Sequence, residues 1–405
     1  MLFAMLAVLI LGLQLLHRRL LRRVTPASWH RWLTPILGVI HAPLTLYMGL
    51  RLTGFSGLGL VDLLHPLARL GLAFQAITCI HLLVYGVLSG FWAFRRWMGQ
   101  QVDRGPEDPA RRRFLQHSLA GSLGALTVGA GLGVKEAYSE VEVVRLEVGA
   151  EGLPAGLDGL RIVHLTDLHA GPLLPSGRLR YWRALAERER PDLLVFTGDF
   201  VDSQPEELAP LLEAFRDFPA PLGRYAVLGN HDYFQDPRPL WEGLERIGVA
   251  CLENRNVQVR RGDGVLAVMG LQDPMARDGR FQGVRFGPGP DPDAASAGLP
   301  PEAWRLCLTH RPTDWRWARR AGAHLTLAGH THGGQINLIP GVSSARMLGP
   351  WTSGLYRDGG QALYVSRGLG VVGLPLRLAA APELTVLTLR RHEIPTLKPA
   401  RTLAS

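Results

Sequence analysis

Five polar clusters, each directly after an apolar run of strand length, constrain this chain more than any other feature. They offer carboxylate, amide and imidazole groups, and their order is Asp167-Leu168-His169, Gly198-Asp199-Phe200-Val201-Asp202, Gly229-Asn230-His231-Asp232, Thr309-His310 and Gly329-His330-Thr331-His332. The carboxyl ends of neighbouring strands in an open α/β sheet meet at one edge, where such sheets bind ligands. The order therefore predicts a fold that gathers these side chains around a pair of metal ions.

The chain from about Val141 onward alternates β-rich runs with amphipathic stretches, which is typical of the α/β class. The runs Leu193–Phe196 and Ala226–Leu228 are apolar throughout, as strands covered on both faces should be. Ser176 is the expected N-cap of the first helix, and Gly283–Pro301 is expected to form a loop. Strands are expected at 161–165, 192–196, 224–228, 249–252, 257–260, 265–271, 305–309, 324–328, 362–366 and 383–389, and helices at 177–190, 205–215, 240–247 and 313–321.

The types of ligand in the clusters select a class of metal. Imidazole, carboxylate and amide oxygen without thiolate favour Mn, Fe or Zn. No thiolate ligand is expected, because the cysteines 79, 251 and 307 sit in apolar contexts and are expected to be buried apolar residues. In extended chain, residues two apart point to the same side, which would let each Asp-X-His or His-X-His pair reach one ion. The candidate ligands are Asp167, His169, Asp199, Asn230, His310, His330 and His332. Seven ligands are too many for one tetrahedral ion, and they suit two bridged ions of the kind that act on phosphorus.

Four apolar runs precede this region, at 1–16, 32–50, 70–94 and 114–134. A membrane-spanning helix needs roughly 20 apolar residues, so three runs qualify and the first is marginal. We therefore expect a membrane anchor of about four transmembrane helices at 1–137, a catalytic domain at 138–392 and a C-terminal tail at 393–405. The loops 17–31 and 95–113 are rich in arginine, which predicts that they are cytoplasmic. That orientation places the catalytic domain outside the cytoplasm, at the inner or plasma membrane of a bacterium.

Charge is concentrated in the same N-terminal region. Residues 1–137 carry 14 Lys and Arg against 5 Asp and Glu, a net of +9, which equals the +9 of the whole chain. The remainder is neutral, so no nucleic-acid partner is expected. The segment Arg111-Arg112-Arg113-Phe114-Leu115 fits a twin-arginine export signal, which would make the export machinery a partner. It fits equally well the positively charged residues that flank the cytoplasmic end of the last membrane span. His41 and His81 lie within spans, where a haem or quinone site competes with the commoner role of interhelical hydrogen bonding.

The clusters, written as Asp-X-His, Gly-Asp-X-X-Asp, Gly-Asn-His-Asp, His and Gly-His-X-His, resemble the calcineurin-like metallophosphoesterase superfamily over about Val141–Arg391. Residues 330–336 (HTHGGQI), 364–370 (YVSRGLG) and 382–385 (PELT) resemble its bacterial membrane-anchored or exported YkuE/YaeI-like branch. The resemblance implies a four-layer α/β/β/α sandwich, with two mixed sheets and two divalent metal ions at one edge.

Residue by residue, the resemblance also implies roles. One metal would be held by Asp167, His169, Asp199 and His332, and the other by Asp199, Asn230, His310 and His330. His231 would bind phosphate and protonate the leaving group, and Asp232 would orient His231. The implied reaction is hydrolysis by a hydroxide held between the two metals.

Nearby residues have plainer interpretations. His164 is expected to be a strand residue that points away from Asp167, and Asp202 is expected to bond backbone near Asp199. Arg311 and Arg367 are candidates to touch phosphate. Trp315 and Trp317 are expected to pack.

The leading functional hypothesis is a membrane-tethered phosphoesterase that cleaves a phosphodiester or pyrophosphate bond of a cell-envelope or lipid-linked substrate. Tethering raises the effective concentration of substrates at the bilayer. One alternative is a UDP-2,3-diacylglucosamine-type pyrophosphatase of lipid A synthesis, which needs a cytoplasmic site. Another is a non-catalytic metal-binding membrane sensor, in which a general acid such as His231 would have no use.

Overall fold

The computed structural model describes residues 128–403, apart from 151, 172–173, 175–176, 203–207, 280, 338–341 and 392–399, together with scattered positions before 128. The chain divides into two compact units, Met1–Leu132 with Gly373–Pro375, and Gly133–Val372 with Leu376–Ser405. The expected spans at 1–16, 32–50 and 70–94, most of 114–134, and also His41, His81 and Arg111–Arg112, lie outside the described residues. Within the described part, none of the helices combines the length and the apolar character that a membrane crossing requires.

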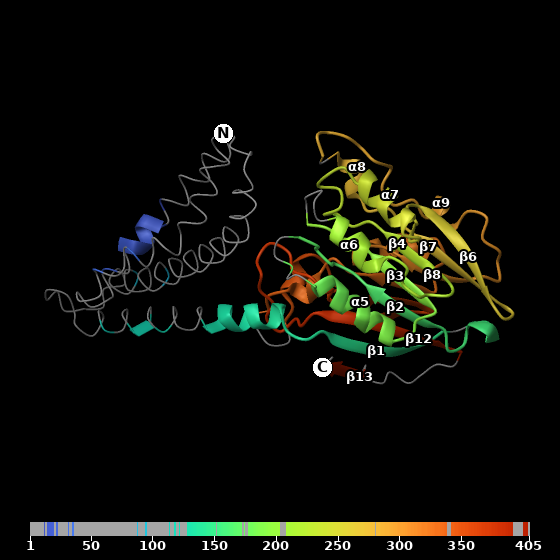
Figure 1. Ribbon diagram of the computed structural model, residues 1–405, viewed down its shortest axis with the longest axis horizontal. Coiled ribbons are helices and arrows are strands. Elements are labelled where there is room, and N and C mark those ends of the chain that lie inside the picture. Colours follow the sequence, from blue (N-terminus) through green and yellow to red (C-terminus); the bar gives the residue numbers. More distant parts are fainter. Residues whose placement is uncertain are drawn as a thin grey trace. The chain divides into compact units, whose positions relative to one another are not determined.

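The second unit contains two mixed sheets (Figure 1). The strands of the first sheet are β1 (Glu142–Gly149), β2 (Arg161–Leu165), β3 (Leu193–Thr197), β4 (Arg224–Val227), β5 (Ala250–Cys251), β12 (Glu383–Arg390) and β13 (Ala400–Leu403). They are ordered β13-β1-β12-β2-β3-β4-β5. The strands of the second sheet are β6 (Arg255–Arg261), β7 (Gly264–Gly270), β8 (Trp304–Leu308), β9 (Leu325–Ala328), β10 (Gly354–Asp358) and β11 (Gln361–Val365). They are ordered β10-β11-β9-β8-β7-β6.

Short helices connect these strands. The α-helices of the second unit are α5 (Arg178–Arg188), α6 (Leu208–Phe215), α7 (Arg238–Arg246), α8 (Met275–Asp278), α9 (Pro292–Ser296) and α10 (Trp315–Arg320). The 3-10 helices are η2 (Ala155–Leu157), η4 (Pro312–Asp314), η5 (His332–Gly334) and η6 (Ser344–Met347).

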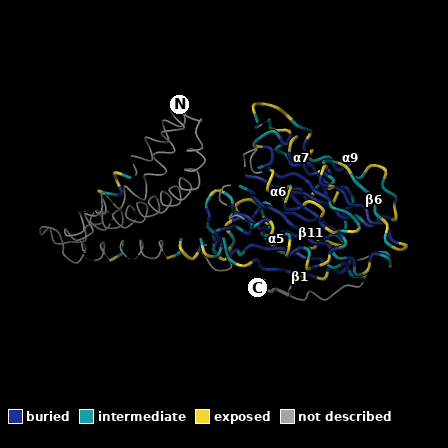
Figure 2. The backbone as a smooth tube through the Cα atoms, in the orientation of Figure 1, coloured by how far each residue is buried: buried dark blue, intermediate teal, exposed yellow. Residues whose placement is uncertain are grey.

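Three hydrophobic cores lie between the layers of sheets and helices, and strand β3 shows how one strand contributes to two of them. Its residues are all buried, and alternate side chains point to opposite faces of the sheet. Leu194 and Phe196 pack with the buried residues of α5, α6 and α7, whereas Leu193 and Val195 pack against the second sheet. A third core lies between the second sheet and α10. Figure 2 shows the buried strands inside a more exposed shell. The α/β expectation with two mixed sheets is confirmed.

Several boundaries differ from expectation. Helix α5 begins after Gly177, whose left-handed conformation ends the preceding turn, and no side chain caps the helix. The segment expected to be a loop at 283–301 includes α9, which Asp291 caps through two backbone N–H groups. Strand β13, in the segment expected to be a tail, pairs antiparallel with β1. Neither β1 nor β10 was expected as a separate strand.

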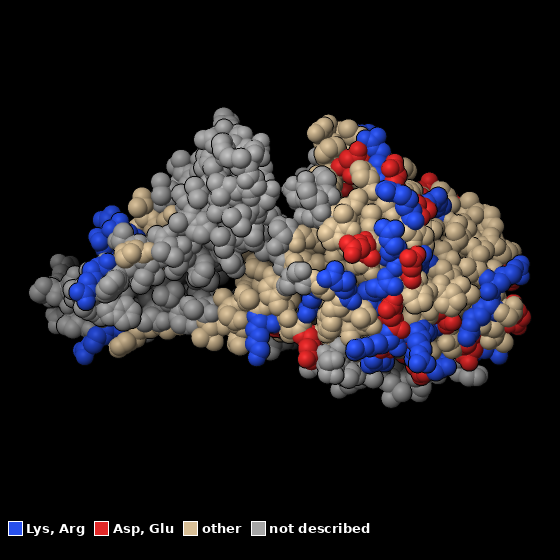
Figure 3. Space-filling view, viewed as in Figure 1, with Lys and Arg blue, Asp and Glu red and all other residues tan. Residues whose placement is uncertain are grey.

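Charges on the surface of this unit are mixed in sign. On the face seen in Figure 3, basic side chains (Lys and Arg, blue) are interspersed with acidic ones (Asp and Glu, red). Several form ion pairs, such as Arg145 with Glu189 and Arg255 with Glu245. This arrangement agrees with the neutral charge balance of the sequence after residue 137.

Candidate metal centre

The candidate ligands lie on loops at one edge, where strands of both sheets end. Strands β2, β3 and β4 are parallel neighbours in the first sheet, and β8 and β9 are parallel neighbours in the second. Each candidate ligand follows one of these strands by two to four residues in the sequence. A bond across the sheets links the two groups of loops, because the Nδ1–H of His310 donates to the carbonyl of Thr197 at 2.8 Å. The structure therefore brings all seven candidate ligands together.

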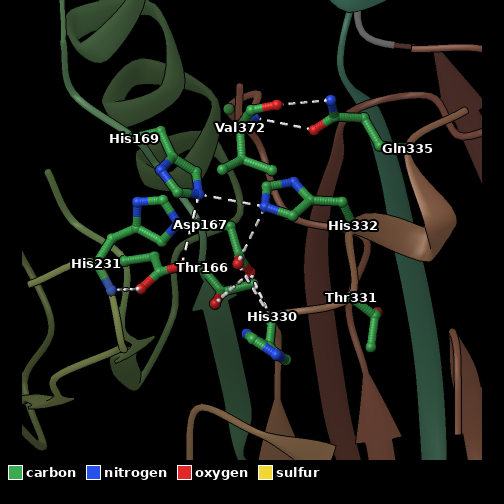
Figure 4. Close-up of polar contacts among 12 residues, drawn as sticks. Thr166, Asp167, His169, His231, His330, Thr331, His332, Gln335 and Val372 are labelled. Carbon is green, nitrogen blue, oxygen red and sulfur yellow. Dashed lines mark hydrogen bonds and ion pairs between the residues drawn. The ribbon is translucent and has the colours of Figure 1, made fainter. Parts of the chain in front are cut away.

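One set of ligands comprises Asp167, His169 and His332. The Nε2 atoms of His169 and His332 lie 3.2 Å apart, and the Nε2 of His332 lies 3.4 Å from the Oδ1 of Asp167. Figure 4 shows the two rings pointing toward one another, with Asp167 beside them. This set brings two imidazoles and a carboxylate to one point.

A second set surrounds His310, which is fully buried. Its Nε2 lies 3.3 Å from the Oδ2 of Asp199, 3.0 Å from the Oδ1 of Asn230 and 3.0 Å from the Nδ1 of His330. The Oδ2 of Asp199 also lies 3.6 Å from the Nε2 of His169. Asp199 therefore stands between the two sets.

This donor set fits a pair of divalent cations. Asp167 and Asp199 are 0% and 2% exposed, and buried carboxylates require a compensating positive charge. The bond from His310 Nδ1 to a carbonyl leaves Nε2 as the ring nitrogen that faces Asp199, as in metal-binding histidines whose other ring nitrogen is bonded to a neighbour. No thiolate is present among these donors, which favours Mn, Fe or Zn over soft metals.

The protonation state of the metal-free site follows from burial and charge. Burial lowers the pKa of His310, but the carboxylates of Asp199 and Asp167 outweigh burial and raise it to about 10. Burial and the neighbouring charge on His310 lower the pKa of His330 to about 3. In the absence of metal, His310 is therefore protonated in preference to His330, and metal binding must release that proton.

Five candidate ligands have left-handed backbone. The φ angles of Asp167, His169, Asp199, His330 and His332 are 52°, 44°, 53°, 70° and 50°. This finding corrects the expectation that extended geometry aligns the i and i+2 ligands. The chain turns sharply after each strand, and left-handed residues other than glycine carry strain that is typical of functional sites.

Glycines beside the ligands leave no room for a side chain. A Cβ atom added at Gly329 would collide with the Oδ2 of Asp167, and one added at Gly229 would collide with the Oδ1 of Asp199. These two glycines are therefore needed for the close approach of the backbone to the carboxylates.

His231 lies next to both sets. Its side chain is 17% exposed, and its Nδ1 lies 3.1 Å from the carbonyl oxygen of Asp202. The backbone N–H of His231 donates to the Oδ1 of Asp199 at 2.8 Å, and its ring meets the ring of His169 edge-on at 4.7 Å. Burial lowers the pKa of His231, and the charge on Asp199 partly offsets that effect.

The structure exchanges the expected roles of two carboxylates. The carboxylate of Asp232 accepts hydrogen bonds from three backbone N–H groups, those of Phe200, Val201 and Gly229, at 2.9, 3.2 and 2.8 Å. It joins the loops after β3 and β4, and the expectation that it orients His231 is wrong. The Oδ1 of Asp202 instead lies 3.2 Å from the Nδ1 of His169. The Gly-Asp-X-X-Asp motif drew attention to Asp202 in the sequence. Only the folded loops show that its carboxylate faces the imidazole ring of His169.

The two arginines that were candidates to touch phosphate, Arg367 and Arg311, differ in their contacts. Arg367 forms ion pairs with Glu142 and Glu383 at 2.8 and 2.6 Å, so its expected contact with phosphate is not supported. Arg311 pairs with Asp273 at 2.7 Å and lines a cavity of about 240 Å³ together with His330.

Two of the plainer interpretations agree with the structure. His164 lies inside β2, and its Nε2 is 2.7 Å from the hydroxyl of Thr197. Trp315 packs edge-on against Trp351.

Arg377 is a residue that the sequence did not indicate. Its side chain is completely buried, and its Nη2 lies 3.2 Å from the Nδ1 of His332. The guanidinium donates to the carbonyls of Gly370 and Ala380, at 2.6 and 2.8 Å, and to two further carbonyls. It lies in an apolar run without any motif, so no sequence signal could have singled it out.

Two of the three segments that resemble the YkuE/YaeI-like branch, 330–336 and 364–370, support the site from behind. The N–H of Gly370 donates to the carbonyl of Asp167 at 2.7 Å, and the N–H of Leu369 donates to that of Thr166 at 3.1 Å. The side chain of Gln335 makes two hydrogen bonds of 2.9 Å with the backbone of Val372, as Figure 4 shows. These bonds tie the loop of His332 to the loop behind Asp167.

Comparison with known proteins agrees with this geometry. The family model for calcineurin-like phosphoesterases matches residues 160–334. The uncharacterized metallophosphoesterase YkuE of Bacillus subtilis is 32% identical over 295 residues, which are 69% of this chain and 98% of that protein. An uncharacterized metallophosphoesterase of Aquifex aeolicus is 30% identical over 63% of this chain and 95% of its own length.

A vertebrate relative also matches. A zebrafish protein named "Transmembrane protein with metallophosphoesterase domain" is 33% identical over 64% of this chain, and the match spans 60% of that protein's length. With a bacterial relative matched over nearly its whole length, the chain belongs to the calcineurin-like metallophosphoesterase family and is a metal-dependent phosphoesterase.

Proposed function

We propose that this protein is a membrane-tethered phosphoesterase that hydrolyses a phosphodiester or pyrophosphate bond of a cell-envelope or lipid-linked substrate. The observation that carries the proposal is the convergence of seven ligand side chains in two sets, six of them buried, with Asp199 between the sets and His231 alongside. One metal would be held by Asp167, His169, Asp199 and His332, and the other by Asp199, Asn230, His310 and His330. Divalent cations bound there would supply Lewis acidity and a water of lowered pKa.

The part of the reaction assigned to the chain itself is proton transfer by His231. The carbonyl of Asp202 accepts from Nδ1–H, which leaves Nε2 as the ring nitrogen for the substrate. A protonated Nε2 would donate to the leaving oxygen, and burial, which lowers the pKa of His231, makes the ring a stronger acid. Asp202 thus supports both His169 and His231, whereas Asp232 holds the loops that carry Asp199 and Asn230.

Tethering and orientation rest on the sequence. Four apolar runs with arginine-rich loops between them favour a multi-pass anchor and an extracytoplasmic catalytic domain. The name of the zebrafish relative, which describes a transmembrane protein, supports a membrane location. An anchored site meets bilayer-bound substrates at a high effective concentration.

The test uses the full chain in detergent, stripped of metal and reloaded with Mn²⁺, Fe²⁺ or Zn²⁺, with bis(p-nitrophenyl) phosphate as substrate. We expect metal-dependent turnover that falls about 10²–10⁴-fold in His231→Ala, while the metal content stays at two ions per chain. His324→Ala is the matched control, because His324 lies just before β9 and stacks on Trp304, at the other end of these strands from the ligand loops. Full turnover in the His231 variant would refute the role of His231 as the general acid. No turnover of this diester or of a monoester by the folded, metal-loaded protein would refute the proposed function.

A further inference from the structure

Exposed apolar side chains are concentrated in three loops of the second unit. Among the residues described there, the exposed large apolar side chains are Phe234, Val284, Val342, Met347 and Leu348. Met347 is 91% exposed and Leu348 is 57% exposed. Exposed apolar residues that gather in a few loops indicate an interaction surface rather than chance exposure. We call these five residues the apolar rim.

The apolar rim adjoins the metal centre. The ring of Phe234 lies 4.6 Å from the ring of His231. Phe286, two residues from Val284, lies 6.2 Å from the ring of Tyr233, the neighbour of Phe234. On the other side, Leu348 lines the cavity of about 240 Å³ that also contains His330. The rim therefore borders the site on the side of His231 and on the side of His330.

The cavity has a polar part and an apolar part. Arg311, which is paired with Asp273, forms the polar part together with His330 and Thr331, whereas Leu348 and Trp351 form an apolar wall. An amphiphile would fit with its phosphate toward His330 and an acyl chain along Leu348. A small water-soluble phosphoester would leave the apolar wall unused.

Basic residues accompany the exposed apolar ones. Arg346 is exposed beside Met347, and Arg285 is exposed beside Val284. The described segment 342–349 (VSSARMLG) contains no acidic residue. Apolar side chains flanked by arginine are typical of surfaces that enter the interface of an anionic bilayer, because the arginines meet lipid phosphates while the apolar groups reach the acyl chains.

We propose that the apolar rim docks the catalytic unit onto an anionic phospholipid bilayer, so that the phosphoester bond presented to the metal centre belongs to a membrane lipid. The lipid's phosphate lies toward His330 and Arg311, and its acyl chain contacts Leu348 and Trp351. The part of this inference that concerns hydrolysis rests on the proposed function. Docking itself does not, and the two are tested separately.

Docking is tested with an environment-sensitive fluorophore on the full chain in nanodiscs of phosphatidylcholine and phosphatidylglycerol. The fluorophore is attached at Met347→Cys or at Gln258→Cys, which is exposed on the edge strand β6. The unsubstituted chain gives the background from its own three cysteines. We expect lipids with a quencher on the acyl chain to quench the probe at position 347 and to leave the probe at 258 unaffected. Equal quenching at both positions, or none at 347, overturns the docking surface.

Substrate class is tested by inhibition of diester hydrolysis in mixed micelles. We expect phosphatidylglycerol to raise the KM for bis(p-nitrophenyl) phosphate, and the water-soluble glycerophosphoglycerol at equal concentration to have no effect. Met347→Glu should weaken this inhibition about tenfold, because it removes the burial of one large apolar side chain, and Gln258→Glu should not. Equal inhibition by the soluble head group, or an unchanged Met347→Glu variant, overturns the inference. Absence of metal-dependent turnover without any lipid refutes the proposed function and leaves the quenching result to decide docking.

Discussion

Replacing Arg377 by methionine tests how the loop behind His332 is held in place. The guanidinium is completely buried, and burial lowers its pKa to about 10, so it remains charged at neutral pH. All three of its nitrogens donate to backbone carbonyls: Nε to Gly370 at 3.1 Å, Nη1 to Ala380 at 2.8 Å and Nη2 to Gly370 at 2.6 Å. Methionine fills a similar volume and leaves these carbonyls buried without a donor.

The magnitude follows from the number of bonds. A hydrogen bond to a charged group contributes about 1.5 kcal/mol net, after the cost of removing both groups from water. Three donating nitrogens therefore give a loss of about 4.5 kcal/mol in the free energy of unfolding. For a domain of this size that corresponds to a fall in Tm of about 9–18 °C. Arg377→Lys keeps the charge but offers one nitrogen, so it should retain about a third of the stabilisation.

The assay is thermal unfolding of the full chain in detergent, followed by the near-ultraviolet circular dichroism of its aromatic residues. Arg357→Met is the control, because Arg357 is exposed and donates one hydrogen bond of 3.0 Å to the carbonyl of Gly149. A Tm of Arg377→Met no lower than that of the control would refute the reasoning. It would mean that the loop from Gly368 to Ala380 is held by its other contacts.

Two further predictions concern charge in and beside the site. Asp199→Asn keeps the shape of the side chain but removes the charge between the two ligand sets, so metal affinity should fall more than about 100-fold and elemental analysis after dialysis should find fewer than two ions per chain; two retained ions would contradict the bridging position. Burial raises the pKa of Glu253 from 4.5 to about 7 in the folded protein, so the stability that its protonated form contributes is complete below pH 4.5 and is lost as the pH rises to about 7. Chemical denaturation between pH 4.5 and 7 should show a loss of stability that is steeper, by on the order of 1 kcal/mol per pH unit, than the loss in Glu253→Gln, and parallel profiles would show that Glu253 does not contribute to it.

Individual strands could be predicted from the sequence better than the order in which they pair in the sheets. Strand β3 could be recognised because Leu193–Phe196 is an unbroken apolar run, which follows from burial on both faces. Strand β1 pairs with β12, far away in the sequence, and no local pattern carries the register of such a pair. The seven candidate ligands could be predicted because each follows a recognisable strand and has a side chain suited to metal.

The sequence by itself determined the inventory of the site: which side chains carry ligand atoms, and at which strand ends they stand. Both are local properties, fixed by residue type and by apolar runs. The tertiary structure alone decided the left-handed backbone at Asp167 and Asp199, the exchange of roles between Asp202 and Asp232, and the burial of Arg377 behind His332. Each of these features depends on which loops come into contact at the edge of the two sheets. The long-range packing of the two sheets against each other determines those contacts.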